Sequence, residues 1–252
     1  MSPIVTEAEV GPTDVLAIRF ATADPLAGDH ELVLRHRKAG HERRVRAQIP
    51  ETAVPLTSLE LTPGLWDAYL SGAAGEIRLI STDPGFSLDR LDSYALSSRT
   101  LGFHAYRTMD GYLALKVRKL LAMAEVRAVW LRERRFEVTG LLAYTGLSDD
   151  GVRRNARLIM QQRGSVSSVE VGATVEGVRF HAAMSLFGLL NPGSWEPSLE
   201  VDGLGTPLRL SARIDDVLSK RRRLQYPAAT VDGMRIQPYY DTRDDLYVGV
   251  EA

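Results

Sequence analysis

The chain has 252 residues and a formal net charge of −1, with 31 basic residues against 32 acidic ones. A net charge this close to zero excludes a global electrostatic attraction to nucleic acid or to an anionic membrane. Because the sequence contains no Cys, disulfides, thiolate catalysis and Cys-ligated metals are excluded as well.

The apolar content of 44% and the charged content of 25% are typical of a globular protein. No apolar run approaches the ~20 residues that a membrane-spanning helix needs, and no signal-peptide pattern precedes Arg19. We therefore expect a cytoplasmic protein without membrane insertion.

The first half of the chain consists of short segments rich in Val, Ile and Leu, with turn signals such as residues 38–41 between them. The first two segments are residues 8–10 and 16–20. Near the end of this half, residues 113–117 alternate strictly between apolar and other side chains. A period of two is what a half-buried β-strand requires.

Residues 31–49 contain an arginine-rich hairpin. If Leu32, Leu34, Val45, Ala47 and Ile49 point inward, alternation turns four arginines to the opposite face. These are Arg35, Arg37, Arg44 and Arg46. Guanidinium groups on adjoining strands repel unless anionic groups lie across them, and they bind phosphate and carboxylate well. The face is either an anion-binding site or a solvated surface neutralised by Glu42, Glu51 or the other domain.

A turn that ends in tryptophan occurs twice. The copies read Leu61-Thr-Pro-Gly-Leu-Trp66-Asp67 and Leu190-Asn-Pro-Gly-Ser-Trp195-Glu196. Pro fixes φ for a turn and Gly takes the positive φ that follows, so each Trp lands at a defined place at the start of a strand. Because Trp buries a large apolar area, each one is expected to anchor a core between two sheets.

Tyrosines stand beside a turn before the last strand of each half, namely Tyr106 with Arg107 and Tyr239 with Tyr240. Tyrosine rings with a few hydrogen-bonding groups can bind sugars, so these residues are candidates for ligand binding. The structural alternative is the tyrosine corner of a Greek-key sandwich, in which the hydroxyl bonds back to the backbone.

Two segments, residues 118–135 and 149–164, have the composition of helices. A longer internal repeat favours strands there, because it aligns residues 124–126 with a segment that Gly11-Pro12 follows, and Pro cannot continue a helix. We predict strand from about Glu125 onward and over residues 157–163.

Further matches extend this repeat along both halves of the chain. The matched pairs are residues 8–10 with 124–126, 16–20 with 138–142, 32–34 with 158–160, 77–79 with 208–210, and Tyr106 with Tyr240. The spacing between partners rises steadily, as small insertions in the second copy would produce. The sequence thus predicts an all-β protein of two tandem Ig-like antiparallel β-sandwich domains from an internal duplication, at residues 1–120 and 121–252.

Residues 105–117, and the run from Ala173-Thr-Val-Glu-Gly-Val-Arg-Phe180 to Trp195, provide a family resemblance. They resemble the tandem Ig-like accessory domains of actinobacterial teichoic-acid-type glycosyltransferases and CDP-glycerol glycerophosphotransferases. The chain departs from that pattern at Asp110-Gly-Tyr112 and at Asp244-Asp245. The resemblance implies a pair of accessory modules without the transferase activity, because the catalytic domains of those enzymes have no counterpart in this sequence.

Other charged groups indicate no specific chemistry. Lys220-Arg-Arg-Arg223 could bind phosphate, but Asp215-Asp216 offsets it and charge runs are usually solvated. No His pair has a metal-ligand spacing, and no Gly-rich phosphate loop precedes a helix. We predict no catalytic residue, metal or cofactor.

The preferred function is a non-catalytic accessory module beside a glycopolymer transferase. Its partner would be an anionic glycopolymer, a partner enzyme or a second copy of the chain, but not nucleic acid. One alternative is a transferase-like or natural-product biosynthetic enzyme with its site in the inter-domain cleft. Another is a carbohydrate-binding module. The candidate ligand-binding residues are Arg35, Arg37, Arg44, Arg46, Tyr106, Arg107, Tyr239 and Tyr240.

Overall fold

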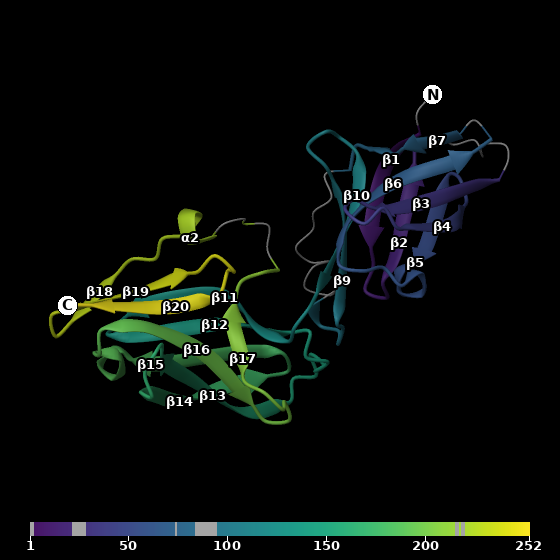
Figure 1. Cartoon of the computed structure of the whole chain (residues 1–252). Helices are drawn as coiled ribbons and strands as arrows, with labels where there is room; N and C mark the ends of the chain where they lie inside the picture. Colours follow the sequence, from purple (N-terminus) through teal and green to yellow (C-terminus); the bar gives the residue numbers. More distant parts are fainter. Residues whose placement is uncertain (1–2, 22–28, 74, 84–94, 215–216, 218–219) are drawn as a thin grey trace. The chain divides into compact units, whose positions relative to one another are not determined.

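The computed structural model describes residues 3–21, 29–73, 75–83, 95–214, 217 and 220–252. In these residues the chain is all-β, as predicted, apart from short helical turns (Figure 1). The chain divides into two compact units, unit 1 (Met1–Tyr94 and Arg99–Leu120) and unit 2 (Ala95–Ser98 and Leu121–Ala252). No helix among the described residues is long and apolar enough to cross a membrane.

Unit 1 is built from two sheets. The first has the order β5 (Glu51–Pro55), β2 (Val15–Phe20), β1 (Ile4–Val10), β8 (Ile80–Ser81). The second has the order β4 (Glu42–Ala47), β3 (His30–His36), β6 (Gly64–Gly72), β10 (Leu113–Lys119), β9 (Leu101–Arg107), and β7 (Gly75–Arg78) pairs with β6. Buried residues of both sheets form one apolar core that includes Trp66.

Unit 2 has strands equivalent to those of unit 1 but joins them in a single sheet. Its strands are β11 (Met123–Arg132), β12 (Arg135–Ala143), β13 (Arg153–Gln162), β14 (Ser168–Glu176), β15 (Arg179–Ser185), β16 (Gly193–Val201), β17 (Leu208–Ser211), β18 (Ala229–Val231), β19 (Met234–Tyr240) and β20 (Leu246–Glu251). They form one sheet in the order β13-β14-β15-β12-β11-β17-β16-β20-β19-β18, and β13 also pairs with β16. The strands from β13 to β16 in this order therefore close into a barrel, which the sequence analysis did not predict.

Two differences from unit 1 let the barrel close, and the first is the connection between β14 and β15. In unit 2 a tight turn at Gly177 joins β14 to β15, and the two strands pair from Ala173 to Glu176. The equivalent strands of unit 1, β4 and β5, are separated by Gln48-Ile49-Pro50. Proline has no N–H for a ladder, and β4 and β5 belong to different sheets. The second difference is that β17 pairs with both β11 and β16, whereas its unit 1 equivalent is split into β7, which pairs with β6, and β8, which pairs with β1. Unit 1 therefore keeps two sheets where unit 2 has one.

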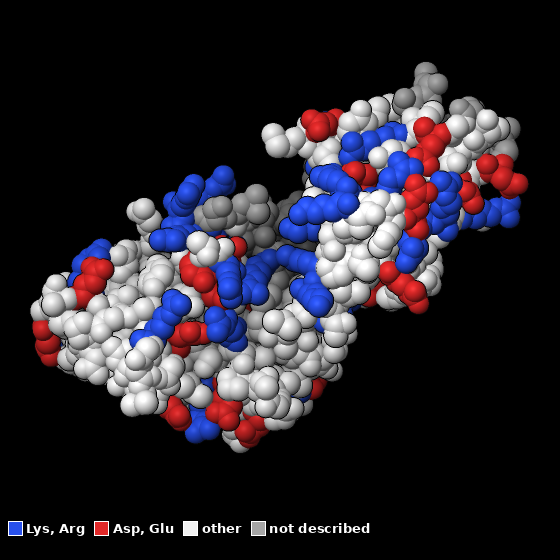
Figure 2. All heavy atoms as spheres, in the orientation of Figure 1, with Lys and Arg blue, Asp and Glu red and all other residues white. Residues whose placement is uncertain are grey.

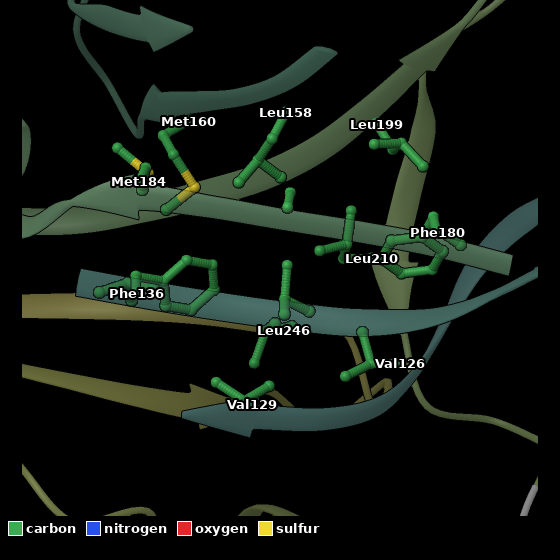
Figure 3. Packing of buried hydrophobic residues seen from close by; sticks show 14 of the residues in the cluster. Val126, Val129, Phe136, Leu158, Met160, Phe180, Met184, Leu199, Leu210 and Leu246 are labelled. Carbon is green, nitrogen blue, oxygen red and sulfur yellow. The ribbon is translucent and has the colours of Figure 1, made fainter. Parts of the chain in front are cut away.

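The two Trp turns have the same geometry. Trp66 and Trp195 are each 1% exposed, and their Nε1 atoms donate to the carbonyls of Thr62 (2.9 Å) and Asn191 (3.1 Å). The prediction that each Trp anchors a core is confirmed. In unit 2, Figure 3 shows apolar side chains of different strands pointing toward one another inside the barrel, Phe136 and Phe180 among them.

Strand register tests the predicted repeat residue by residue. Trp66 lies opposite His36 and Trp195 opposite Gln162, so residues 32–34 correspond to residues 158–160, as predicted. The segments that resembled helices are the strands β11 and β13, again as predicted.

Three of the predicted matches are wrong by register. The bulge after Val5 in β1 has its equivalent after Val126 in β11, so residues 8–10 do not correspond to residues 124–126. Directly after these bulges Glu7 pairs with Arg19 and Ala128 pairs with Thr139, so residues 16–20 correspond to residues 136–140 and not to residues 138–142. At the other end, Tyr106 pairs with Ala114 and Tyr239 with Tyr247. Tyr106 therefore corresponds to Tyr239, and not to Tyr240.

Candidate ligand-binding face

The predicted arginines gather on the outward face of the second sheet of unit 1, which we call the arginine–tyrosine face. Its register places Arg35 between Glu42 and Asp67, and it places Tyr69 opposite Arg78. Leu32, Leu34 and Ala47 are buried on the other side, as the alternation predicted. The face consists of Arg35, Arg37, Arg44, Arg46, Asp67, Tyr69, Glu76, Arg78, His104, Tyr106, Tyr112, Lys116 and Arg118, with Glu31 and Glu42 at its edge.

At the β4 side of the face the arginines are neutralised by carboxylates. Arg35 donates to Glu42 and Glu76 at 2.6 Å each, and Arg44 donates to Glu42 at 2.9 Å. These bonds raise the pKa of Arg35 and lower the pKa of Glu42. Arg46 pairs with Asp29 at 3.0 Å in full solvent. Figure 2 shows the resulting mixture of positive and negative side chains over β3, β4 and β6.

Asp67 is the central carboxylate of the face, because two guanidinium groups share it. Arg37 donates to both of its oxygens (2.6 and 3.2 Å), and Arg78 donates to Oδ1 at 2.6 Å. Burial raises the pKa of Asp67, but the bond from Arg37 and the charge of Arg78 outweigh burial and lower it overall. One carboxylate cannot neutralise two guanidiniums, so this cluster has a surplus positive charge.

The arginines also cover tyrosine rings. The Arg35 guanidinium carbon lies 4.6 Å from the ring centre of Tyr69, and that of Arg78 lies 4.4 Å from the ring centre of Tyr112. At these distances the cation is attracted to the π face of the ring. Both contacts fix the guanidinium groups against the sheet.

The β9–β10 side of the face is electropositive. Lys116 and Arg118 extend from β10 beside His104 on β9, and among the described residues neither is within 4.0 Å of a carboxylate. Burial, together with the charges of Arg118 and Lys116, lowers the pKa of His104. The His104 ring is parallel to that of Tyr106, with 6.2 Å between the ring centres, and the Tyr106 hydroxyl interacts with Arg37.

The structure thus brings together Arg35, Arg37, Arg44, Arg46 and Tyr106 of the predicted site. Arg107 points to the other side of β9, where its guanidinium lies beside the Gly111 turn. Sequence reasoning missed Tyr69, Arg78, His104, Lys116 and Arg118, although alternation in residues 113–117 would have placed Lys116 outward.

The remaining two predicted residues lie on unit 2, on opposite sides of β19. Tyr239 is stacked on Tyr247 (5.6 Å between ring centres), and its hydroxyl contacts Ser194 Oγ at 2.8 Å. Tyr240 is buried and its hydroxyl bonds to that of Tyr226 at 3.3 Å. Tyr240 is therefore a core residue.

Other predicted features are structural or lie outside the described residues. Lys220 is buried and its Nζ donates to the Val217 carbonyl at 2.9 Å, so it is not part of an exposed basic run. Asp215 and Asp216 lie outside the described residues. Within the described part of the chain, no three His, Asp or Glu side chains gather as metal ligands.

Comparisons with known proteins give distant likenesses only. No family model and no curated protein matches the chain. Among solved structures, the chain is similar to S. aureus TarS 217-571, with 12% identity and a TM-score of 0.36 over 82% of this chain and 61% of that one. A longer S. aureus TarS structure matches at 11% identity and a TM-score of 0.38, over 81% of this chain and 38% of that one.

A two-domain fibronectin type III segment of chicken tenascin matches at 7% identity and a TM-score of 0.26, over 82% of this chain and 95% of that one. In contrast to this tenascin segment, less than two thirds of the length of either TarS structure is spanned by the chain.

Proposed function

We propose that the chain is a non-catalytic module that binds an anionic glycopolymer on the β9–β10 side of the arginine–tyrosine face, as an accessory to a glycopolymer transferase. The observation that supports this most is the surplus positive charge there. Lys116 and Arg118 have no described carboxylate partner, and Arg37 shares Asp67 with Arg78. Positive groups held side by side on a rigid sheet attract a chain of repeating phosphates or carboxylates.

The aromatic groups fit the sugar or polyol part of such a polymer. Tyr106 and His104 present parallel rings between the positive groups. A ring offers an apolar surface for C–H groups, and its hydroxyl or ring nitrogen bonds to hydroxyl groups. A polyol phosphate polymer of the teichoic-acid type combines both kinds of group.

The carboxylates of the face favour binding over acid–base catalysis. Bonds from arginine lower the pKa values of Glu42 and Asp67, so both groups are weak bases and hold no proton to donate near neutral pH. Efficient general acid–base catalysis needs a pKa near the working pH.

We further infer that the units descend from one duplicated Ig-like sandwich. The Trp turns, the Arg78–Asp67 and Arg209–Glu196 pairs, and the parallel β1–β8 and β11–β17 pairings occur at equivalent places. The link to a transferase is supported by the sequence resemblance of residues 105–117 and 173–195.

The test is a binding titration with poly(glycerol phosphate) on the whole chain. Lys116→Ala combined with Arg118→Ala is expected to weaken binding at least about tenfold and to reduce its dependence on salt, because two charge contacts are lost. The matched control is Arg44→Ala with Arg46→Ala, which also removes two positive charges but at the neutralised side of the face. Equal losses in the two double variants, or no binding by the wild type, would refute the proposal.

A further inference from the structure

A groove of about 1050 Å³ lies on the outward side of the unit 2 barrel. Its floor is a row of side chains that face one another across four strands. Thr139 on β12 lies opposite His181 on β15, His181 opposite Thr174 on β14, and Thr174 opposite Asn155 on β13. This volume is at the upper end of the range of about 300–1,000 Å³ that is typical of small-molecule sites.

The floor is rich in hydrogen-bond acceptors. The Thr139 hydroxyl donates to the Phe180 carbonyl at 2.9 Å, and the Thr174 hydroxyl donates to the His181 carbonyl at 3.3 Å. Asn155 uses its amide nitrogen on Asp202 at 3.0 Å. The hydroxyl lone pairs and the amide oxygen therefore remain for a ligand that donates hydrogen bonds.

The charged groups of the groove are each paired with a group of opposite charge. Arg179 bonds to Asp149 at 2.8 Å, and Arg153 lies 3.7 Å from Glu176. Arg154 bonds to Asp150, which lies just outside the groove lining, at 2.9 Å. A groove whose ionic groups are neutralised in this way has little attraction for a strongly charged ligand. Its chemistry suits a neutral molecule with many hydroxyl groups.

Trp130 does not line the groove itself, but it is next to the Thr139 end of the floor. Ala128 lies opposite Thr139, and Trp130 is two residues from Ala128 on the same side of β11. It is 42% exposed, it lies opposite Glu137 on β12, and Glu137 is two residues from Thr139 on the same side of that strand. Arg132 bonds to Glu137 at 2.9 Å and lies 5.5 Å from the Trp130 ring centre. The bond from Arg132 lowers the pKa of Glu137, which keeps this carboxylate ionised as a further acceptor.

The fold itself does not require a tryptophan there, because unit 1 has a glutamate in the equivalent place. Glu9 pairs with Ala17 as Trp130 pairs with Glu137. Arg19 takes the place of Thr139 and bridges Glu7 (3.1 Å) and Glu51 (3.0 Å). The surface depression of unit 1 that Glu9, Arg19 and Glu51 line has a volume of only about 360 Å³. An exposed Trp beside an open, acceptor-rich groove is thus specific to unit 2.

We propose that this groove is a saccharide-binding site for a neutral glycan segment. Sugar hydroxyls donate to Thr139, Thr174 and Asn155, His181 accepts or donates according to its tautomer, and a pyranose ring packs on the exposed part of Trp130. The site lies wholly on unit 2, so its test is independent of the test of the proposed anionic site on unit 1.

The experiment follows the indole N–H signals of the whole chain by ¹H–¹⁵N NMR during titration with maltohexaose, cellohexaose and chitohexaose. The chain has 3 Trp residues, and Trp66 and Trp195 are each 1% exposed, so one indole signal is expected to move. Trp130→Ala, and separately His181→Ala, should weaken binding about tenfold, in line with the loss of one aromatic or one hydrogen-bonding contact. Added salt should change the affinity little.

The control is Phe187→Ala, which removes another exposed aromatic side chain of unit 2, 46% exposed, that follows β15 and is not a register neighbour of the Thr139–Asn155 row. All three substitutions are at exposed positions, and thermal melting confirms that each variant is folded. The proposal is overturned if none of the three hexasaccharides moves the Trp130 signal, or if Trp130→Ala and His181→Ala bind as tightly as Phe187→Ala.

Discussion

Replacing each buried tryptophan by phenylalanine tests whether the two Trp turns contribute equally to the stability of their units. In Trp195→Phe the Asn191 carbonyl loses the donor that lies 3.1 Å away, and the loss of one hydrogen bond costs about 0.5–1.5 kcal/mol when water can reach the acceptor. The smaller ring leaves a void of roughly 40 Å³, which at about 24 cal/mol per Å³ adds about 1 kcal/mol. The free energy of unfolding of unit 2 should therefore fall by about 1.5–2.5 kcal/mol. The same reasoning gives the same range for Trp66→Phe in unit 1.

Hydrogen exchange measured by mass spectrometry reports the two units separately. Trp66 and Trp195 belong to different core clusters, so Trp195→Phe should speed exchange of the slowest amides in β16 and β20 and leave those of β6 and β10 unchanged. Trp66→Phe should do the reverse. The reasoning is refuted if either variant costs less than about 1 kcal/mol, since the hydrogen bond and the void alone exceed that.

Three more outcomes are expected. Glu133 and Arg134 form the two-residue turn of the β11–β12 hairpin, with φ of 52° and 59°. Because Asn-Gly adopts positive φ more easily, replacing the two residues by Asn-Gly should stabilise unit 2 by about 1 kcal/mol. The gain would be measured as slower hydrogen exchange in that hairpin. Gly64→Ala should destabilise unit 1 by more than about 2 kcal/mol in the same assay, because a Cβ would lie 2.1 Å from His36 Nε2 at a φ of +150°. The pKa of His104 is lowered in the folded chain, so its contribution to stability is present above pH ~6.5 and is lost as pH falls below that value. The melting temperature of His104→Gln should therefore fall less between neutral and mildly acidic pH than that of the wild type. An equal fall in both proteins would contradict the lowered pKa.

The sequence predicted the parts of the fold that a distinctive residue marks. The Trp turns fixed the match of residues 32–34 to residues 158–160, since a Trp at a Pro-Gly turn has few alternative placements. The match of residues 8–10 failed because Ala-Glu-Val is common in strands and a bulge shifts the register there. Tyr106 was matched to Tyr240 because two adjacent tyrosines, Tyr239 and Tyr240, allow two registers. Only the pairings of β9 with β10 and of β19 with β20 decide between them.

The candidate site was predictable only in part. Alternation placed Arg35, Arg37, Arg44 and Arg46 outward, but two of the carboxylates that neutralise them, Asp67 and Glu76, come from β6 and β7. These strands reach the arginines because β3 lies between β4 and β6, and sheet order cannot be read from local sequence. The saccharide groove was missed because the row across β12, β15, β14 and β13 depends on the pairing of β14 with β15, which unit 1 lacks.

The central claim, that an anionic glycopolymer binds on the β9–β10 side of the arginine–tyrosine face, is tested most directly by the pKa of His104. Burial and the charges of Arg118 and Lys116 hold this pKa below its usual value, so a polyanion lying across those two cations should raise it. The measurement is an NMR titration of the His104 imidazole with and without saturating poly(glycerol phosphate). A rise in the His104 pKa on binding is the predicted result, and polymer binding that leaves this pKa unchanged would contradict the claim.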